Sequence, residues 1–167
     1  MKKILVFPGQ GSQTVGMGKE IYENFQEARN VFEEVQDVLK TNLINTIFSG
    51  PAEDLNLTEN TQPALMTISA AFLRVMEKEF GFDVSESTFV AGHSLGEYTA
   101  LLAAGVITLE QAARLLKIRG REMQKAVPVG RGKMIAVLGL TLEQAESVVA
   151  VVRHELPQKV CALANDN

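Results

Sequence analysis

The spacing of apolar and polar residues along this 167-residue chain predicts strands that alternate with helices. Apolar runs at residues 3–7 and 88–91 are each followed by a glycine-rich turn and are predicted to be strands, the first of them buried. Residues 17–40 carry apolar side chains at helical spacing, with glutamates on the other side. A second long helix is predicted to begin at Pro63 and to end near Gly81, because proline favours the first helical turn and glycine the position after the last. This alternation indicates an α/β fold.

Three further stretches complete the first part of the chain. Residues 52–60 are polar and are predicted to be a loop. Residues 95–104 are predicted to form a helix that Gly105 closes. Residues 108–126 are predicted to form another, which begins with the capping-box sequence Thr-Leu-Glu-Gln.

The composition changes after the flexible stretch at residues 129–132. Apolar runs at 133–138 and 160–164 are predicted to be strands on either side of a capped helix over 141–152. A β-α-β fragment of this size cannot bury both faces of its sheet, so we expect the sequence to stop within a domain.

Composition and charge narrow the classes of function. The chain is 46% hydrophobic, 22% charged and has a formal net charge of −4, which is ordinary for a globular protein but leaves few cations to neutralise phosphates. We therefore expect neither nucleic acid nor a membrane surface as a partner. The single cysteine, Cys161, cannot form an internal disulfide, and no apolar run is as long as a membrane span, so we expect a cytoplasmic protein. No residue cluster has metal-ligand spacing, and we expect no metal.

The strand at 88–91 leads into Gly92-His93-Ser94-Leu95-Gly96, the Gly-x-Ser-x-Gly pattern of a nucleophile elbow. In such a turn the serine hydroxyl projects from the corner between strand and helix, because the flanking glycines have no side chains. The amide of Leu95, at the start of the helix, would point toward a developing oxyanion. Strand, glycine turn and helix are the context that the pattern requires, so Ser94 is the candidate nucleophile.

A second glycine-rich turn, residues 8–13, follows the first strand, where open α/β sheets place ligands. It lacks the Lys-Ser/Thr ending of a P-loop and the spacing of a dinucleotide fingerprint, which argues against nucleotide binding. A tight turn is the alternative interpretation. Gln10, whose backbone amide lies between two glycines, is the candidate residue here, and Gln62, at the expected mouth of the helix from Pro63, is another.

One cation interrupts an apolar helix face. Within residues 108–126, the positions at core spacing are apolar except for Arg119. The guanidinium could extend out of the core or pair with a carboxylate such as that of Glu97. Alternatively it faces a cavity and binds an anionic substrate group, since its planar fork suits a carboxylate.

A serine nucleophile needs a base, and the chain has two histidines. His93 adjoins Ser94 in the turn, so its side chain should diverge from the serine and pack beneath the elbow. His154 lies in the charged segment Arg-His-Glu, where exposure is expected. The residues alone therefore assign no base.

Four motifs occur together and in order: Phe-Pro-Gly-Gln-Gly-Ser-Gln at 7–13, Thr-Gln-Pro-Ala-Leu at 61–65, Gly-His-Ser-Leu-Gly-Glu-Tyr at 92–98, and Arg-Gly-Arg at 119–121. With these motifs, essentially the whole chain resembles the malonyl-CoA:acyl carrier protein transacylases of bacterial fatty acid synthesis. The resemblance implies that malonyl-CoA is the acyl donor, that acyl carrier protein is the acceptor, and that no cofactor is needed beyond the coenzyme A thioester, which is a substrate.

The resemblance also implies a role for four of the candidate residues. Ser94 would be the acylated nucleophile, the backbone amides of Gln10 and Leu95 would form the oxyanion hole, and Arg119 would hold the malonyl carboxylate. The implied fold is an incomplete α/β-hydrolase-like large subdomain, residues 1–129, with the beginning of an inserted ferredoxin-like small subdomain, residues 130–167.

Members of this family are nearly twice as long, and their general base is a histidine beyond the point where this sequence ends. General base catalysis contributes roughly 10²- to 10⁴-fold, so we expect the chain as given to be severely impaired. Two other functions stay open. A serine esterase or thioesterase would share the elbow but has no use for an arginine in the pocket wall, and a non-catalytic fragment would only bind acyl-CoA.

Overall fold

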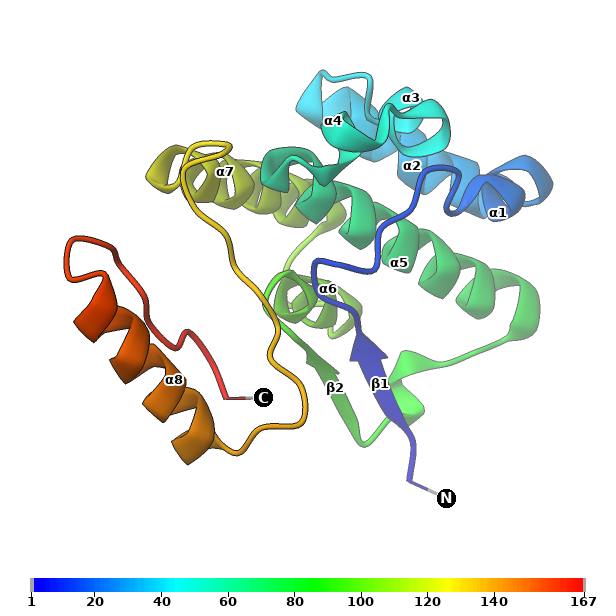
Figure 1. Cartoon of the computed structure of the whole chain (residues 1–167). Coiled ribbons are helices and arrows are strands. Elements are labelled where there is room, and N and C mark those ends of the chain that lie inside the picture. The colour runs from blue at the N-terminus through cyan, green and yellow to red at the C-terminus, as the bar shows by residue number, and fades with distance from the viewer. Residues whose placement is uncertain (1, 167) are drawn as a thin grey trace. The chain divides into compact units, whose positions relative to one another are not determined.

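The computed structural model describes residues 2–166, which form short strands and many helices (Figure 1). The elements in chain order are β1 (Ile4–Phe7), α1 (Lys19–Asn24), α2 (Gln26–Leu39), α3 (Leu43–Ser49), α4 (Ala52–Asn56), α5 (Thr58–Phe80), the 3-10 helix η1 (Val84–Glu86), β2 (Phe89–Gly92), α6 (Leu95–Ala103), α7 (Leu109–Ala126) and α8 (Leu142–Glu155). The chain divides after Val129 into two compact units. None of the helices in residues 2–166 is long and apolar enough to cross a membrane.

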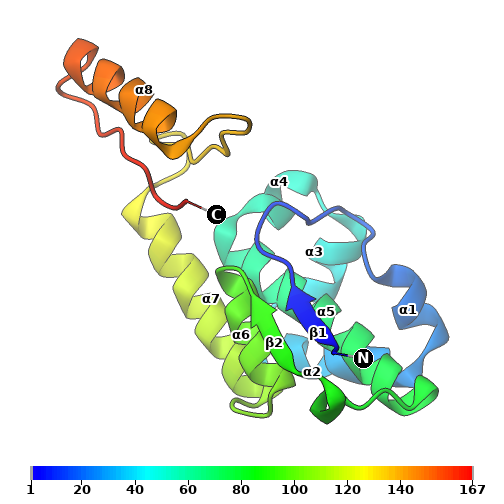
Figure 2. The same ribbon diagram turned by 90° about the horizontal axis from the view of Figure 1, so that it is seen from below.

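The strands β1 and β2 pair in parallel, with Ile4 opposite Phe89 and Phe7 opposite Gly92. Both strands therefore end at the same edge of the sheet, and the turns that follow them lie next to each other. Helix α6 packs against both strands, as Figures 1 and 2 show. The sequence placed both strands within one residue of these bounds. The expected burial of β1 is wrong, because Ile4 and Val6 are 59% and 74% exposed on a sheet that has two strands in the described chain.

Helix α5 is the centre of the core in the first unit. All of its residues from Thr61 to Ile68 are buried, and it packs against α2 on one side and α7 on another. An apolar stripe on α2, which includes Val31 and Val35, fits the helical spacing in the sequence. An apolar hollow of about 250 Å³ lies between β1 and α5, lined by residues such as Val6 and Phe72.

Three helix predictions need correction. The helix expected over 17–40 is two helices, because Phe25 is extended with φ −125° and ψ 124°. Residues 52–60 are largely helical rather than a loop. There α4 follows Pro51 and has acidic residues in its first turn, where the helix dipole favours them. Helix α5 begins at Thr58, five residues before Pro63, and contains the proline without ending.

The second unit contains helix α8. It begins where the sequence predicted, because Thr141 and Gln144 form a capping box. The strands expected at 133–138 and 160–164 are wrong, since neither segment is a strand. A strand needs a neighbouring strand to share its backbone hydrogen bonds, and the described part of this unit supplies none. Leu138 and Val160 are accordingly 89% and 99% exposed.

Candidate active site

Ser94 stands at a sharp turn between β2 and α6. Its backbone has φ 56° and ψ −108°, a left-handed conformation that non-glycine residues rarely adopt. The turn is closed by two glycines. A Cβ on Gly92 would lie 2.1 Å from the carbonyl carbon of Gly96, and one on Gly96 would lie 2.4 Å from the carbonyl oxygen of Phe7. The local geometry is therefore that of a nucleophile elbow, as the motif predicted.

The turn after β1 lies against this elbow. A Cβ on Gly9 would approach Nδ1 of His93 to 3.0 Å, so the two turns are in contact. The Gln10 side chain donates from Nε2 to Oγ1 of Thr58 at 3.5 Å, which links the turn to the start of α5. Within residues 2–166, the backbone amides of Gln10 and Leu95 donate to no backbone carbonyl.

Arg119 reaches the elbow from α7. Its Nη2 donates to Oγ of Ser94 at 2.9 Å, and its Nη1 donates to Oε1 of Gln62 at 2.8 Å. Its guanidinium carbon also lies 5.8 Å from the ring centroid of Tyr98 on α6. Three elements thus bring a serine, an arginine and a glutamine into direct contact.

Gln62 does not lie at a helix mouth, as the sequence suggested. It is fully buried in the second turn of α5, because the helix begins at Thr58 rather than at Pro63. Its Nε2 donates to Sδ of Met123 at 3.2 Å, so both ends of its side-chain amide are engaged by α7. Gln62 is therefore a buried residue between α5 and α7 that contacts the arginine.

The side chains that the Arg119 guanidinium contacts in the described chain, Ser94, Gln62 and Tyr98, are uncharged. No carboxylate in the part of the chain that the structure describes lies within 4.0 Å of its guanidinium, and Glu97, the partner considered from the sequence, is exposed and does not pair with it. The neighbouring cations differ, since Lys117 and Arg121 both pair with Glu59, at 3.5 and 3.8 Å. A half-buried cation without a counter-ion favours an anionic ligand.

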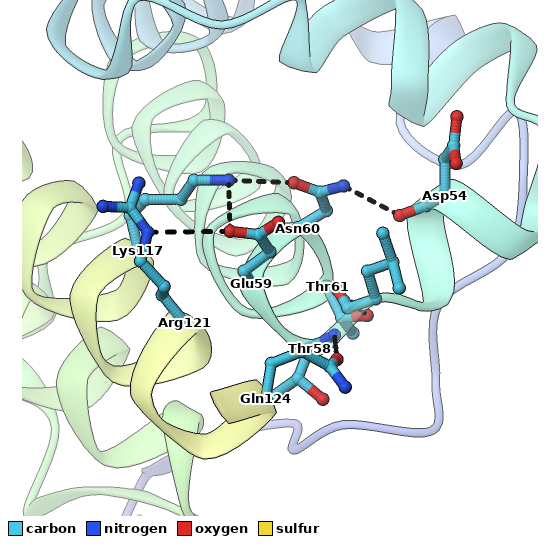
Figure 3. Close-up of polar contacts among 9 residues, drawn as sticks. Asp54, Thr58, Glu59, Asn60, Thr61, Lys117, Arg121 and Gln124 are labelled. Atoms are coloured by element: carbon cyan, nitrogen blue, oxygen red, sulfur yellow. Dashed lines mark hydrogen bonds and ion pairs between the residues drawn. The ribbon is translucent and has the colours of Figure 1, made fainter. Parts of the chain in front are cut away.

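Figure 3 shows how α7 is fixed on the first turns of α5. Lys117 contacts Glu59 and also donates to Oδ1 of Asn60 at 3.0 Å, and the amide of Thr58 donates to Oε1 of Gln124 at 3.3 Å. The helices also approach closely, because a Cβ on Gly120 would lie 2.6 Å from the Thr58 carbonyl oxygen. These contacts set the position of α7 along α5.

Sequence reasoning missed this junction, which places Arg119 opposite Gln62. The one signal for it was Gly120, a glycine inside a predicted helix and next to the arginine, where a close helix contact is a common reason for glycine.

No histidine in residues 2–166 hydrogen-bonds to Ser94. His93 is exposed and its ring lies beside Gly9, so it is not packed beneath the elbow. His154 is exposed on α8. Among the described side chains, no group of three or more His, Cys, Asp or Glu could hold a metal ion.

Comparison with known proteins places this geometry in a family. The model of a family described as "Acyl transferase domain" matches residues 4–166. Malonyl CoA-acyl carrier protein transacylase from Bacillus subtilis is 47% identical over 156 residues, which are 93% of this chain and 48% of the relative.

Solved structures agree with this match. The acyl-carrier-protein-S-malonyltransferase from Bartonella henselae superposes with a TM-score of 0.90 at 52% identity, covering 100% of this chain and 52% of that one. A malonyl-transacylase in complex with its type II PKS acyl-carrier protein has a TM-score of 0.84 at 42% identity, with coverages of 93% and 49%. The chain spans about half the length of these relatives. Because the family model matches almost every residue, the chain belongs to the acyl transferase domain family.

Proposed function

We propose that this chain supplies the acyl-accepting serine and the carboxylate-binding arginine of a malonyl-CoA:acyl carrier protein transacylase in fatty acid biosynthesis. The observation that carries the proposal is the 2.9 Å contact between Ser94, at a strained elbow, and Arg119, a cation without a counter-ion in the described chain. The names of the relatives point to the same reaction. We further propose an α/β-hydrolase-like large subdomain over 1–129, a ferredoxin-like one that begins at 130, and a cytoplasmic location.

The reaction is a double displacement at Ser94. The serine Oγ attacks the malonyl thioester carbonyl, the carbon–sulfur bond breaks, and coenzyme A leaves as the thiol that takes up the serine proton through a general base. The thiol of acyl carrier protein then attacks the serine ester and carries the malonyl group away, and its proton returns to the serine. The backbone amides of Gln10 and Leu95 stabilise the oxyanion in both steps, each by about 2.7–4 kcal/mol.

Arg119 selects the acyl group. A charge-assisted hydrogen bond between its guanidinium and the free malonyl carboxylate contributes about 1.5–3 kcal/mol. An acetyl group has a methyl in place of that carboxylate and would leave the cation unpaired. A serine esterase has no such requirement, so the Arg119 contact favours the transacylase over that alternative.

Mass spectrometry after incubation with malonyl-CoA tests the proposal. Because no described histidine bonds to Ser94, imidazole is added as an external base. We expect one malonyl group on the peptide that contains Ser94, no label on that peptide in Ser94→Ala, and a larger loss of malonyl than of acetyl labelling in Arg119→Ala.

Each alternative gives a different result. Label on another residue, or none on Ser94, would contradict the nucleophile and favour the non-catalytic acyl-CoA-binding fragment. Release of free malonate, with no transfer to the thiol of an added acyl carrier protein, would identify a thioesterase. Equal losses of malonyl and acetyl labelling would show that Arg119 is structural.

A further inference from the structure

We propose that Gln62 is a positioning residue that determines acyl specificity, because it orients the Arg119 guanidinium without neutralising its charge. The inference rests on the proposed function of Ser94 and Arg119. Gln62 itself would touch no substrate, since it is fully buried within α5 behind the arginine.

The orientation of the Gln62 side chain follows from its partners. A guanidinium has only donors, so the group that faces Nη1 of Arg119 at 2.8 Å must be the amide oxygen. The amide nitrogen then faces Sδ of Met123 at 3.2 Å, which is a weak acceptor. Because the side chain is enclosed on both sides, the oxygen is fixed as the acceptor for the arginine.

This acceptor fixes the guanidinium plane. One terminal nitrogen of Arg119 is held by Gln62 and the other by Ser94 Oγ, while the ring of Tyr98 lies 5.8 Å from the guanidinium carbon. A guanidinium has five N–H donors, so donors remain for a carboxylate after these two contacts. A fork held in one plane beside the nucleophile suits bidentate recognition of a planar carboxylate.

The neutrality of Gln62 is the second part of the argument. A glutamate at this position would reach the same nitrogen and form a buried ion pair with Arg119. The carboxylate of the acyl group would then have to compete with an internal one. An amide gives the hydrogen bond without the charge, which agrees with the absence of any carboxylate near Arg119 in residues 2–166.

Two variants of the full chain separate orientation from charge, and the readout is the ratio of malonyl to acetyl labelling on Ser94. In Gln62→Glu we expect this ratio to fall by about tenfold or more, because the internal carboxylate neutralises Arg119. In Gln62→Met, which keeps the length but replaces the amide oxygen with a thioether sulfur, a much weaker acceptor for the guanidinium, we expect a smaller fall. In ¹⁵N NMR spectra of arginine, we also expect the separate Nη signals of Arg119 to merge in this variant as the fork rotates freely.

The matched control is Gln36→Glu on α2, where Oε1 accepts from the amide of Ile44 at 3.1 Å, away from the site. It adds the same charge and should leave the labelling ratio unchanged. A general loss of stability would lower malonyl and acetyl labelling together and would not change the ratio.

The outcomes distinguish the two proposals. If the wild-type chain prefers malonyl on Ser94 and both Gln62 variants keep that preference, the inference is wrong and the proposed function stands. If the wild-type chain shows no labelling of Ser94 or no preference, the proposed function fails and the inference fails with it. Should Gln62→Glu not fold, the Gln62→Met ratio and NMR spectrum decide alone, and an unchanged ratio with separate signals would overturn the inference.

Discussion

Ser94 can keep its left-handed backbone because the glycines on either side of it have no side chains. The start of α6 can therefore pack closely against both strands. Gly92 lies against the backbone of Gly96, and Gly96 lies against the backbone of Phe7. The motif alone predicted this turn, since only glycine fits such approaches. The interrupted apolar face likewise drew attention to Arg119, but its partners could not be predicted, because they come from residues 25 and 57 positions away in the sequence.

Replacing Gly92 with alanine should destabilise the first unit strongly. The new Cβ would lie 2.1 Å from backbone atoms of Gly96, so α6 must move away from the sheet. We expect a loss of about 1–3 kcal/mol or more in the free energy of unfolding, measured by urea denaturation. Gly81→Ala is the control, because its Cβ meets nothing within 4 Å and only its φ of +64° is unfavourable, which should make it less costly. Equal effects would contradict the steric explanation.

Helix boundaries were predictable where a side chain caps them. Helix α7 begins at Leu109 as expected, since Thr108 and Gln111 form a capping box. Helix α5 begins after Leu57, which has no side-chain cap hydrogen bond, so no residue pattern marks its start, and the predicted start at Pro63 lies five residues too late. That error of five residues is what misplaced Gln62 and hid its pairing with Arg119.

The contact between α5 and α7 can be tested at Gly120. Helix propensity alone predicts that Gly120→Ala stabilises the protein by up to about 1 kcal/mol. Instead we expect a loss of about 1–3 kcal/mol, because the Cβ would lie 2.6 Å from Thr58 and Glu59 backbone atoms and force the helices apart. Urea denaturation measures the effect, and malonyl labelling of Ser94 should fall with it as Arg119 moves from Gln62. A stabilised variant would refute the close-packing argument.

On the scale of the whole chain, the two units differ in what they bury. The first unit has a continuous apolar core around α5, whereas α8 in the second unit has no buried residue. The apolar runs at 133–138 and 160–164 predicted strands, but a strand depends on partners at a distance in the sequence. A local pattern therefore predicted α8, which is capped by its own residues, and failed for the segments on either side.

Hydrogen exchange followed by mass spectrometry should show this difference. We expect the amides of α8 to exchange at rates near those of an unfolded peptide, because few apolar contacts oppose its opening. The amides of residues 61–68 in α5, which are all buried, should be protected to nearly the full free energy of unfolding and serve as the internal reference. Equal protection of α8 and α5 would show that the second unit is held by interactions that its burial does not reveal.

The exposed face of β1 also governs how the chain behaves in a concentrated sample. Ile4 and Val6 are exposed on the parallel sheet that β1 and β2 form, and Val6 lines the apolar hollow that extends to Phe72. A strand at the edge of a sheet, with unpaired backbone groups, is a template onto which another polypeptide can add a strand. Self-association of the chain would therefore start at this edge, and charged substitutions at Ile4 or Val6 would oppose it without altering the glycine turns that carry Gln10 and Ser94.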